Sequence, residues 1–159
     1  MISDRRMRII ARLSDDGTNT SAAHLCRVCT EVTGMTGAGI MLLHDEVSQS
    51  LAAASNEVSV QVEELQFTLG EGPAVDACQQ GRPVLEPDLA DPETPRWLGF
   101  TPPAVEAGVR AVFAFPLLVG AERFGALVLY RDRPGPLQAE QHADSLALAE
   151  VAAEAVLLI

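Results

Sequence analysis

The feature that most constrains the fold is a pair of apolar runs near the C-terminal end, separated by a four-residue turn. Residues 109–119, VRAVFAFPLLV, give the strongest strand signal in the chain, and residues 124–130, FGALVLY, follow the turn over 120–123. Apolar runs rich in Val and aromatic residues, joined by a Gly-containing turn, predict a β-hairpin. Hairpins place their strands side by side in opposite directions, so we expect an antiparallel sheet.

A second hairpin is predicted earlier in the chain. Residues 37–43, GAGIMLL, have the pattern of a buried strand, and a turn over 44–48 leads into a partner strand over 50–54. Helical patterns lie before, between and after the two hairpins, which indicates an α+β fold with helices on the faces of the sheet. The other elements that we expect are helices over 2–13, 21–33, 57–66 (capped by Asn56), 73–80 and 138–157, a helix capped by Thr101, and a short strand over 83–86.

The stretch Gly70-Glu71-Gly72-Pro73 predicts a tight turn into the helix over 73–80. Gly allows backbone angles that other residues resist, and Pro is favourable in the first turn of a helix. A Pro-rich connection over 87–103 follows and carries the only Trp of the chain. Long irregular segments inside a compact domain are usually functional, so we expect a binding site in this part of the chain.

Length, charge and apolar content exclude several classes of protein. A chain of 159 residues is expected to form one domain with its own core. Its formal net charge of −11, with every cation an Arg, argues against binding to nucleic acid or to an anionic membrane. The sequence has neither an apolar run long enough for a membrane span nor the apolar core of a signal peptide. We therefore expect a cytoplasmic protein with reduced thiols.

Five stretches together resemble one family. The chain is similar to a GAF domain, a small-molecule sensor module, and most similar to the actinobacterial GAF domains that precede an ANTAR RNA-binding output domain. The similarity covers nearly the whole chain. The stretches that carry it are GAGIMLL at 37–43, ELQFTLGEGPAVDA at 64–77, GRPVLEPDLA at 81–90, VEAGVRAVFAFPL at 105–117 and FGALVLYRDRPGPL at 124–137.

The resemblance implies a GAF/PAS-like antiparallel sheet of five or six strands. The terminal helices would pack together on one face, and pocket loops with short helices would cover the other. Residues 1–159 would form a single GAF domain, with an N-terminal helix and linker over 1–20 and a signalling helix over 138–159. The implied function is non-catalytic sensing for a bacterial antitermination regulator. The sequence ends at Ile159, before any ANTAR domain, and both a piece of a longer regulator and a lone GAF domain stay open.

The candidate ligand pocket follows from the resemblance and from the composition of the segment over 66–108. Ligand sites are commonly apolar, with a few polar groups that orient the ligand. The alternative is that these side chains only fill the core, with Glu71 and Asp76 as structural groups at a helix start. The candidate pocket residues are Phe67, Leu69, Glu71, Asp76, Cys78, Leu89, Trp97, Phe100, Arg110, Phe113 and Phe115.

The cysteines and histidines offer little for catalysis or cofactor binding. Cys26 and Cys29 form a C-x-x-C in the middle of a predicted helix, where packing is the simpler role, and zinc would need two further ligands. Cys78 lies on the helix over 73–80. Some GAF-fold enzymes reduce free methionine sulfoxide with cysteines, and this alternative stays open although no Cys lies between 79 and 109. The pocket segment has no His for haem, residues 79–109 contain no Cys that could attach a bilin, and the cyclic-nucleotide pattern is absent, so we expect no metal, cofactor or catalytic residue.

The terminal helices carry a second functional signal. The helix over 2–13 is expected to turn apolar residues to one face and its arginines to solvent. Apolar residues of the helix over 138–157 spread over more than one face, whereas packing on the sheet needs only one stripe. We therefore expect a homodimer through a helix bundle, the alternative being a C-terminal helix that is simply well buried. For the function, a structural dimerisation module without ligand stays open beside the sensor. The candidate interface residues are Ile9, Ile10, Leu13, Leu146, Ala149 and Val156.

Overall fold

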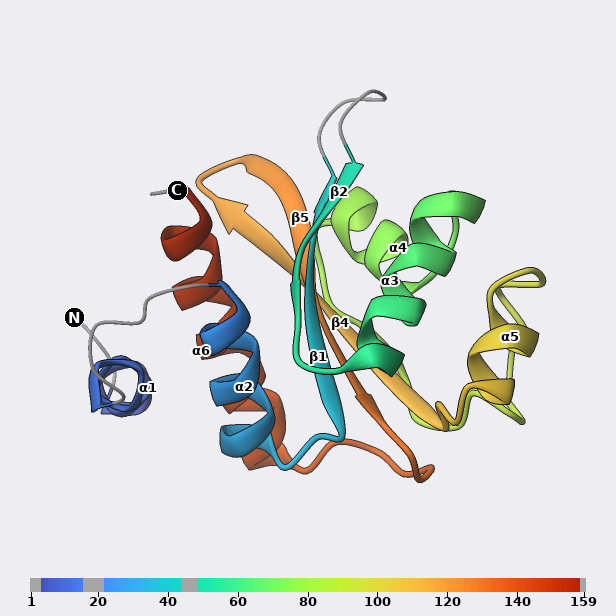
Figure 1. The fold of residues 1–159 in the computed structure, drawn as a ribbon, viewed down its shortest axis with the longest axis horizontal. Helices are drawn as coiled ribbons and strands as arrows, with labels where there is room; N and C mark the ends of the chain where they lie inside the picture. Colours follow the sequence, from blue (N-terminus) through green and yellow to red (C-terminus); the bar gives the residue numbers. More distant parts are fainter. Residues whose placement is uncertain (1–3, 16–21, 44–48, 158–159) are drawn as a thin grey trace.

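The computed structural model describes residues 4–15, 22–43 and 49–157. A five-stranded antiparallel sheet runs through the middle of the molecule, with helices on both faces (Figure 1). This confirms the predicted α+β class and the antiparallel sheet. The order across the sheet is β2-β1-β5-β4-β3. The strands are β1 (Gly37–Leu43), β2 (Gln49–Ala54), β3 (Val84–Glu86), β4 (Ala111–Val119) and β5 (Glu122–Arg131).

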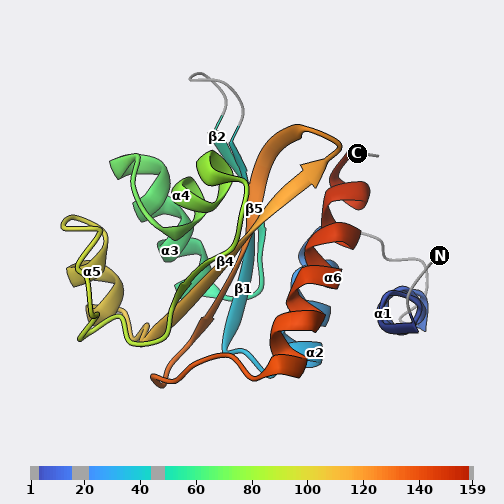
Figure 2. The same cartoon turned by 180° about the vertical axis from the view of Figure 1, so that it is seen from behind.

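The helices form two groups on opposite faces of the sheet. Figures 1 and 2 show the terminal helices together on one face and the helices from the middle of the chain on the other. The first group comprises α1 (Asp4–Asp15), α2 (Ala22–Thr33) and α6 (Ala139–Leu157). The second comprises α3 (Glu57–Leu69), α4 (Pro73–Gln80) and α5 (Thr101–Glu106).

The two hairpins form as predicted, and β5 joins them. Val119 pairs with Glu122 at the tight end of the β4–β5 hairpin, and Gly37 of β1 pairs with Tyr130 of β5. The predicted turn over 44–48 lies outside the described residues. Successive side chains of a strand point to opposite faces. The sheet therefore has two apolar layers, one against α2 and α6 and the other against α3, α4 and α5.

Local sequence signals set most helix ends on the α3 side. The Asn56 side chain accepts a hydrogen bond from the Ser59 N–H at 2.8 Å, which confirms the predicted cap. Gly70 (φ 68°) ends α3 three residues beyond the predicted end over 57–66. Gly81 (φ 68°) ends α4, as glycine does where a left-handed residue is required.

The start of α5 differs from the prediction. Thr101 was expected to cap this helix, but Thr101 is its first residue and Phe100 is the N-cap, with no side-chain cap bond. The reason lies just before the helix, where the Thr101 N–H donates to the Trp97 carbonyl at 3.0 Å. The chain has already turned at Trp97, so the helix does not need a hydroxyl cap.

Helix α1 contacts the rest of the chain through both its apolar face and two of its arginines. Ile9 is 3% exposed and packs into the layer that α2 and α6 share. Arg5 and Arg6 contact α6, where Arg5 donates to Glu140 at 2.7 Å and Arg6 donates to Glu154 at 2.6 Å. The expectation of a solvated arginine side holds for Arg8 and Arg12, which are exposed, but is wrong for Arg5 and Arg6, which dock α1 on α6.

None of the helices in the described parts of the chain combines the length and the apolar character that a membrane-spanning segment requires.

Candidate functional site

The Pro-rich connection is held over the α3 side of the sheet through its single Trp. Trp97 is 3% exposed, and its indole N–H donates to the Asp76 carboxylate of α4 at 2.9 Å. Its ring meets Phe100 edge-on at 5.9 Å between centroids, and the Arg96 guanidinium lies 4.4 Å above its centre. These contacts anchor the connection in the apolar layer, and they leave the Asp76 carboxylate already engaged.

Glu71 forms a second anchor between the turn before α4 and the start of α5. One of its carboxylate oxygens accepts from the backbone N–H of Gly99 at 2.7 Å and of Phe100 at 3.0 Å. Hydrogen bonds to a charged acceptor are stronger than neutral ones. Glu71 and Asp76, both predicted as pocket groups, therefore hold the connection from two points. We call them the two carboxylate anchors.

The structure separates the predicted apolar lining into three places. Leu89, Trp97 and Phe100 lie together, buried in the layer against α4 and α5. Phe67 and Leu69 are about half exposed at the C-terminal end of α3. They do not join the buried group, because Leu65 and Val62 of the same helix face inward instead.

Phe113 and Phe115 do not belong to the predicted pocket. Both are fully buried in the layer against α2 and α6, on the opposite face of the sheet from Trp97. Residues two apart on a strand share a face, and the face toward the connection is taken by Val112 and Ala114. Phe115 meets the His142 ring of α6 at 5.7 Å.

Arg110 and Cys78, also predicted as pocket residues, have structural surroundings. The Arg110 guanidinium donates to the carbonyl of Val105 at 2.8 Å and to that of Val109 at 3.2 Å, which fixes the turn between α5 and β4. Cys78 is 9% exposed, and burial raises the pKa of its thiol. Neither residue lines the surface hollows described below.

The C-x-x-C cysteines are buried on the other side of the sheet. Cys26 and Cys29 are both 0% exposed in the layer against α6, as the packing interpretation expects. Burial raises the pKa of Cys26 to about 12 and that of Cys29 well above its ordinary value. The thiolate is the reactive form, so this environment disfavours thiol chemistry.

Sequence reasoning missed a polar stripe on the inner face of α3. Ser59, Glu63 and Gln66 are spaced by four and three residues, which places them on one side of the helix. They are 3%, 1% and 0% exposed, with Ser59 and Glu63 against β1 and Gln66 against the start of α4. Gln66 is satisfied, because its side-chain oxygen accepts from the Ala74 N–H at 2.7 Å and its amide donates to the Val62 carbonyl at 3.3 Å.

The side chains of Glu63 and Ser59, unlike that of Gln66, lack hydrogen-bond partners in the described part of the chain. Both carboxyl oxygens of Glu63 and the Ser59 hydroxyl are buried without a hydrogen-bond partner among the described residues. Burial raises the pKa of Glu63 to about 9, so the carboxyl holds its proton at neutral pH. Polar groups in a core are normally hydrogen-bonded, which marks this pair as exceptional.

Two glycines of β1 make room for the pair. A methyl group at Gly39 would lie 2.5 Å from the Glu63 carboxyl carbon, and one at Gly37 would overlap the Ser59 hydroxyl and the Tyr130 ring. The pattern G-x-G in a strand opposite S-x-x-x-E in a helix was therefore the available signal. It was missed because the predicted site began at residue 66, beyond this half of α3.

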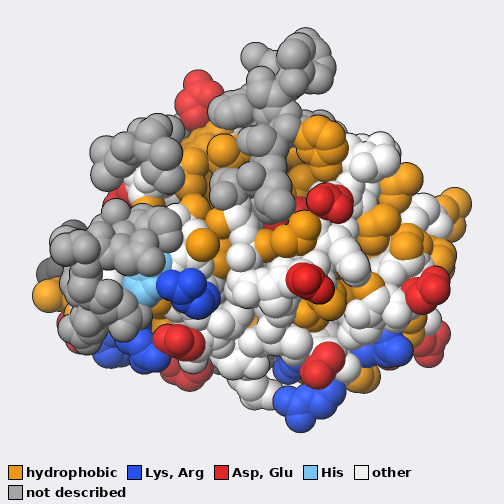
Figure 3. All heavy atoms as spheres, viewed as in Figure 1, with side chains coloured by type: hydrophobic (Ala, Val, Ile, Leu, Met, Phe, Trp, Pro, Cys, Tyr) orange, Lys and Arg blue, Asp and Glu red, His pale blue; other side chains and the backbone are white. Residues whose placement is uncertain are grey.

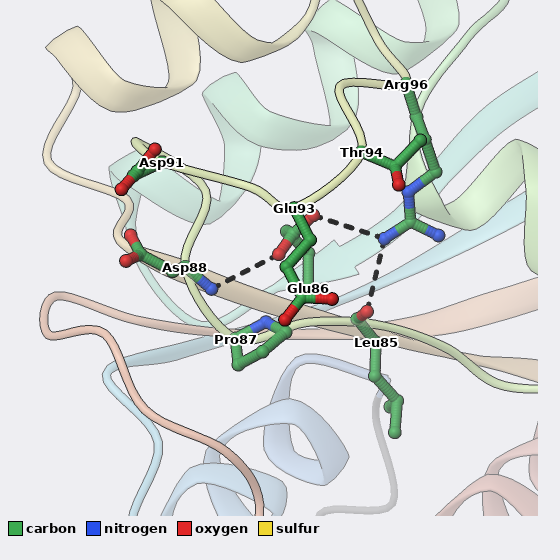
Figure 4. Close-up of a pocket in the computed structure, with 8 residues that line it drawn as sticks. All are labelled: Leu85, Glu86, Pro87, Asp88, Asp91, Glu93, Thr94 and Arg96. Carbon is green, nitrogen blue, oxygen red and sulfur yellow. Dashed lines mark hydrogen bonds and ion pairs between the residues drawn. The ribbon is translucent and has the colours of Figure 1, made fainter.

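Two hollows open on the surface nearby. The first, about 530 Å³, is lined by residues 85–88 with Asp91, Glu93, Thr94 and Arg96. Figure 4 shows Arg96 reaching Glu86 and the Leu85 carbonyl, while Asp91 points away from them. Among the described residues, no group of three or more His, Cys, Asp or Glu side chains is arranged to hold a metal ion.

The second hollow, about 400 Å³, lies between α3 and α5 and includes Leu65, Leu69 and Pro103. In Figure 3, hydrophobic side chains gather on the side of the molecule that α3 and α5 form. Leu98 is 82% exposed just before α5.

The predicted interface residues of the terminal helices divide into buried and exposed ones. Ile9 and Ala149 are 3% and 6% exposed inside the chain's own core, so they cannot contact a partner. Leu13 and Val156 are partly buried against that core. The two with substantial exposure are Ile10 at 40% and Leu146 at 41%.

A five-stranded antiparallel sheet lies between two helical groups, with an anchored connection over one face, and this arrangement defines an α+β domain of three layers. The chain belongs to the GAF domain family, whose model matches residues 20–156. A search of the curated proteins finds no match to this chain.

Solved structures agree with the family assignment at the level of the fold. The GAF domain of a phosphoenolpyruvate-protein phosphotransferase from Coxiella burnetii superposes with a TM-score of 0.72 at 17% identity, covering 98% of this chain and 96% of that one. The corresponding Acinetobacter GAF domain gives 0.70 at 14% identity, covering 99% and 96%. A type II free methionine-R-sulfoxide reductase from Thermoplasma acidophilum gives 0.64 at 17% identity, covering 96% and 95%. The same fold therefore occurs in a domain of a phosphotransferase and in a reductase.

Proposed function

We propose that this chain is the signal-sensing domain of a bacterial transcription regulator and acts without catalysis. It binds a small molecule on the α3 side of the sheet. The observation that carries this proposal is the pair Glu63 and Ser59, buried on that side and left unpartnered by the described residues. Buried polar groups of this kind are unfavourable for folding alone, and they are expected where a ligand supplies the missing partner.

The signal would cross the sheet through β1. Helix α3 packs on β1 and β2 from one side, and α2 packs on the same two strands from the other. A ligand that shifts α3 therefore acts on strands that α2 also contacts. A ligand changes the equilibrium between two arrangements only as far as it binds one of them better. In this mechanism the two carboxylate anchors hold the connection in one arrangement, and the terminal helices report the change.

The terminal helices would form a homodimer. A groove of about 640 Å³ between α1 and α6 has an apolar part that includes Ala143, Leu146 and Ala147. Its walls carry charges of both signs, including Arg8 and Glu150. A surface with an apolar centre and mixed charges at its edges can be complementary to a second copy of itself.

The output would be transcription antitermination by an RNA-binding ANTAR domain outside this chain, in the cytoplasm. This part rests on the stretches that resemble the actinobacterial GAF domains, such as the G-E-G-P turn. The formal net charge of −11 agrees that this domain does not itself bind RNA.

A thiol-dependent reductase of free methionine sulfoxide is the second candidate. The fold it shares with the Thermoplasma acidophilum reductase and the position of Cys78 on α4 favour it. The raised pKa of Cys78 is unfavourable for attack by a thiolate. Thioredoxin-coupled reduction of free methionine sulfoxide, abolished by Cys78→Ser, would establish this candidate in place of the sensor.

The sensor proposal is tested by native mass spectrometry of the purified protein, compared with the denatured protein. An extra mass on each subunit that disappears on denaturation is expected for a sensor with a retained ligand. A weakly held ligand would instead raise the melting temperature in a dose-dependent way when metabolites are added. If neither an extra mass nor any metabolite response appears, the sensor proposal fails and the structural dimerisation module takes its place.

A further inference from the structure

The unpartnered pair on α3 also indicates what kind of ligand it would recognise. Glu63 can accept hydrogen bonds with two oxygens, and Ser59 offers one more acceptor beside it. Burial by itself raises the pKa of Glu63, and no cation of the described residues offsets this effect. The chain therefore places an acid inside its core without supplying the positive group that normally accompanies one.

The elements packed against α3 supply no such group either. Strands β1 and β2 contain no titratable residue. The titratable residues of α4 and α5 are acids or a thiol, namely Asp76, Cys78 and Glu106, and β5 adds the phenol of Tyr130. The cations of β5 have other partners, since Arg123 donates to the Gln79 carbonyl and Arg131 lies over the Phe113 ring on the other face of the sheet. Across the sheet, α2 brings Cys26 near, while its cationic residues His24 and Arg27 contact each other.

We propose that Glu63 and Ser59 are the recognition pair for the cationic nitrogen group, an ammonium or a guanidinium, of a small ligand. This inference rests on the proposed sensing function and names its ligand class. N–H donors on a cation match a carboxylate and a hydroxyl acceptor, and a buried ion pair of this kind is strong when its hydrogen bonds are complete. A metal ion would need more ligands than the described residues bring together here.

The site is small and has a polar approach. The spaces beside Gly39 and Gly37 are filled by the Glu63 carboxyl, the Ser59 hydroxyl and the Tyr130 ring, so a ligand must move the carboxyl rather than enter a preformed cavity. The stripe continues outward to Asn56, half-buried at the start of α3, whose amide donates to the Tyr130 hydroxyl at 3.2 Å. Hydrogen-bonding groups therefore extend from Glu63 to the N-terminal end of α3.

Binding of the cation would release one proton for each ligand bound. The protonated carboxyl loses its proton to solvent, and the carboxylate then pairs with the N–H groups of the ligand. Below the pKa of about 9, the ionised fraction of Glu63 rises about tenfold for each pH unit. The affinity for a permanently charged cation should rise in the same proportion and level off above that pKa.

The test uses methylguanidinium, which stays charged throughout, and methylurea, its neutral counterpart of the same shape. Isothermal titration calorimetry of the whole protein at about pH 6.5, 7.5 and 8.5 should show methylguanidinium affinity rising about 100-fold in total, with no binding of methylurea. Glu63→Gln should lower the affinity more than about tenfold at the highest pH and abolish the pH dependence. Glu64→Gln, at an exposed position on the same helix, is the matched control and should change neither.

Ser59→Ala should weaken methylguanidinium binding while keeping the pH dependence, because Glu63 is still present. The inference is overturned if methylurea binds as well as methylguanidinium, if the pH dependence survives Glu63→Gln, or if the folded wild type binds no methylguanidinium at the highest pH. It is also overturned if a co-purified ligand carries no amine or guanidine, an outcome that leaves the sensing function intact. Absence of any ligand or metabolite response would instead defeat the sensing function itself.

Discussion

At the scale of single residues, Glu63 is the side chain whose cost to folding is clearest. The pKa of Glu63 in the folded protein, about 9, is above its ordinary value of 4.5, so near neutral pH the folded state keeps a proton that the unfolded chain has already released. The stability gained by keeping this proton is complete below about pH 4.5 and is lost as the pH rises toward about 9. Near neutral pH the residue therefore destabilises the ligand-free protein.

Glu63→Gln keeps the shape of the side chain and cannot ionise. We expect this variant to be more stable than the wild type by roughly 2–4 kcal/mol near pH 7.5 and by less than about 1 kcal/mol near pH 5. Urea unfolding at both pH values measures the difference. Glu64→Gln should show no such dependence, and an equal effect of Glu63→Gln at the two pH values would contradict the buried titration.

We expect position 39 to tolerate a larger residue only when the Glu63 carboxyl is absent, because that carboxyl fills the space beside Gly39. The added methyl group of Gly39→Ala would lie 2.5 Å from the Glu63 carboxyl carbon, so we expect a loss of about 1–3 kcal/mol in the free energy of unfolding. In a background of Glu63→Ala the same substitution should cost less than about 1 kcal/mol, because the contact is gone. A double-mutant cycle by urea unfolding checks this, and additive effects would show that the two residues do not meet.

At the scale of elements, the connection between β3 and β4 depends on long-range anchors rather than on its own secondary structure. The two carboxylate anchors lie at the beginning of α4 and bind residues more than twenty positions further along the chain. Loops held by a few hydrogen bonds open at lower free energy than the core. We therefore expect this connection to be the part of the α3 side that responds first when an anchor is removed.

Glu71→Ala removes the acceptor for two backbone N–H groups. We expect the amides of Gly99 and Phe100 to exchange with solvent at least tenfold faster, with a loss of about 1–2 kcal/mol in global stability. Hydrogen exchange read by mass spectrometry measures both. Glu93→Ala, at an exposed acid of the same connection, is the control, and unchanged exchange in Glu71→Ala would contradict the anchoring role.

At the scale of the whole molecule, the two faces of the sheet have different tasks in the proposed mechanism. The α3 side holds the unpartnered acid, and the α2 side presents the terminal helices. The groove between α1 and α6 exposes Leu146, whereas Ile9 and Ala149 are used inside the chain. If a dimer forms through this groove, Leu146 lies at its centre, where truncation or charge is most damaging.

Leu146→Glu places a charge in this groove without disturbing the core, since the side chain is 41% exposed. We expect a folded monomer by sedimentation equilibrium, against a dimer for the wild type. Leu98→Glu makes the same substitution just before α5, on the other face of the sheet, and should remain a dimer. A dimer that survives Leu146→Glu would exclude this surface as the interface.

The local elements could be predicted because their signals are local. The strand over 37–43 and the helix over 73–80 match β1 and α4 residue for residue. An apolar run, a Gly-Pro start and a Gly end act within one element, so the sequence carries them directly. The cap at Asn56 is of the same kind, because its partner Ser59 is three residues away.

What the tertiary structure alone decided are the partners of side chains far apart in the chain. The sequence predicts Phe113 and Phe115 in the pocket, yet the pleat of β4 turns both toward α2 and α6. Glu71 could be read as a helix-start acid or as a pocket group, and its partners lie 28 and 29 residues away. The sequence does not single out Glu63, because acids are common on exposed helix faces. Only the packing of α3 against Gly39 shows that this acid is buried. Local pattern determines which elements form, whereas burial and pairing depend on which elements meet.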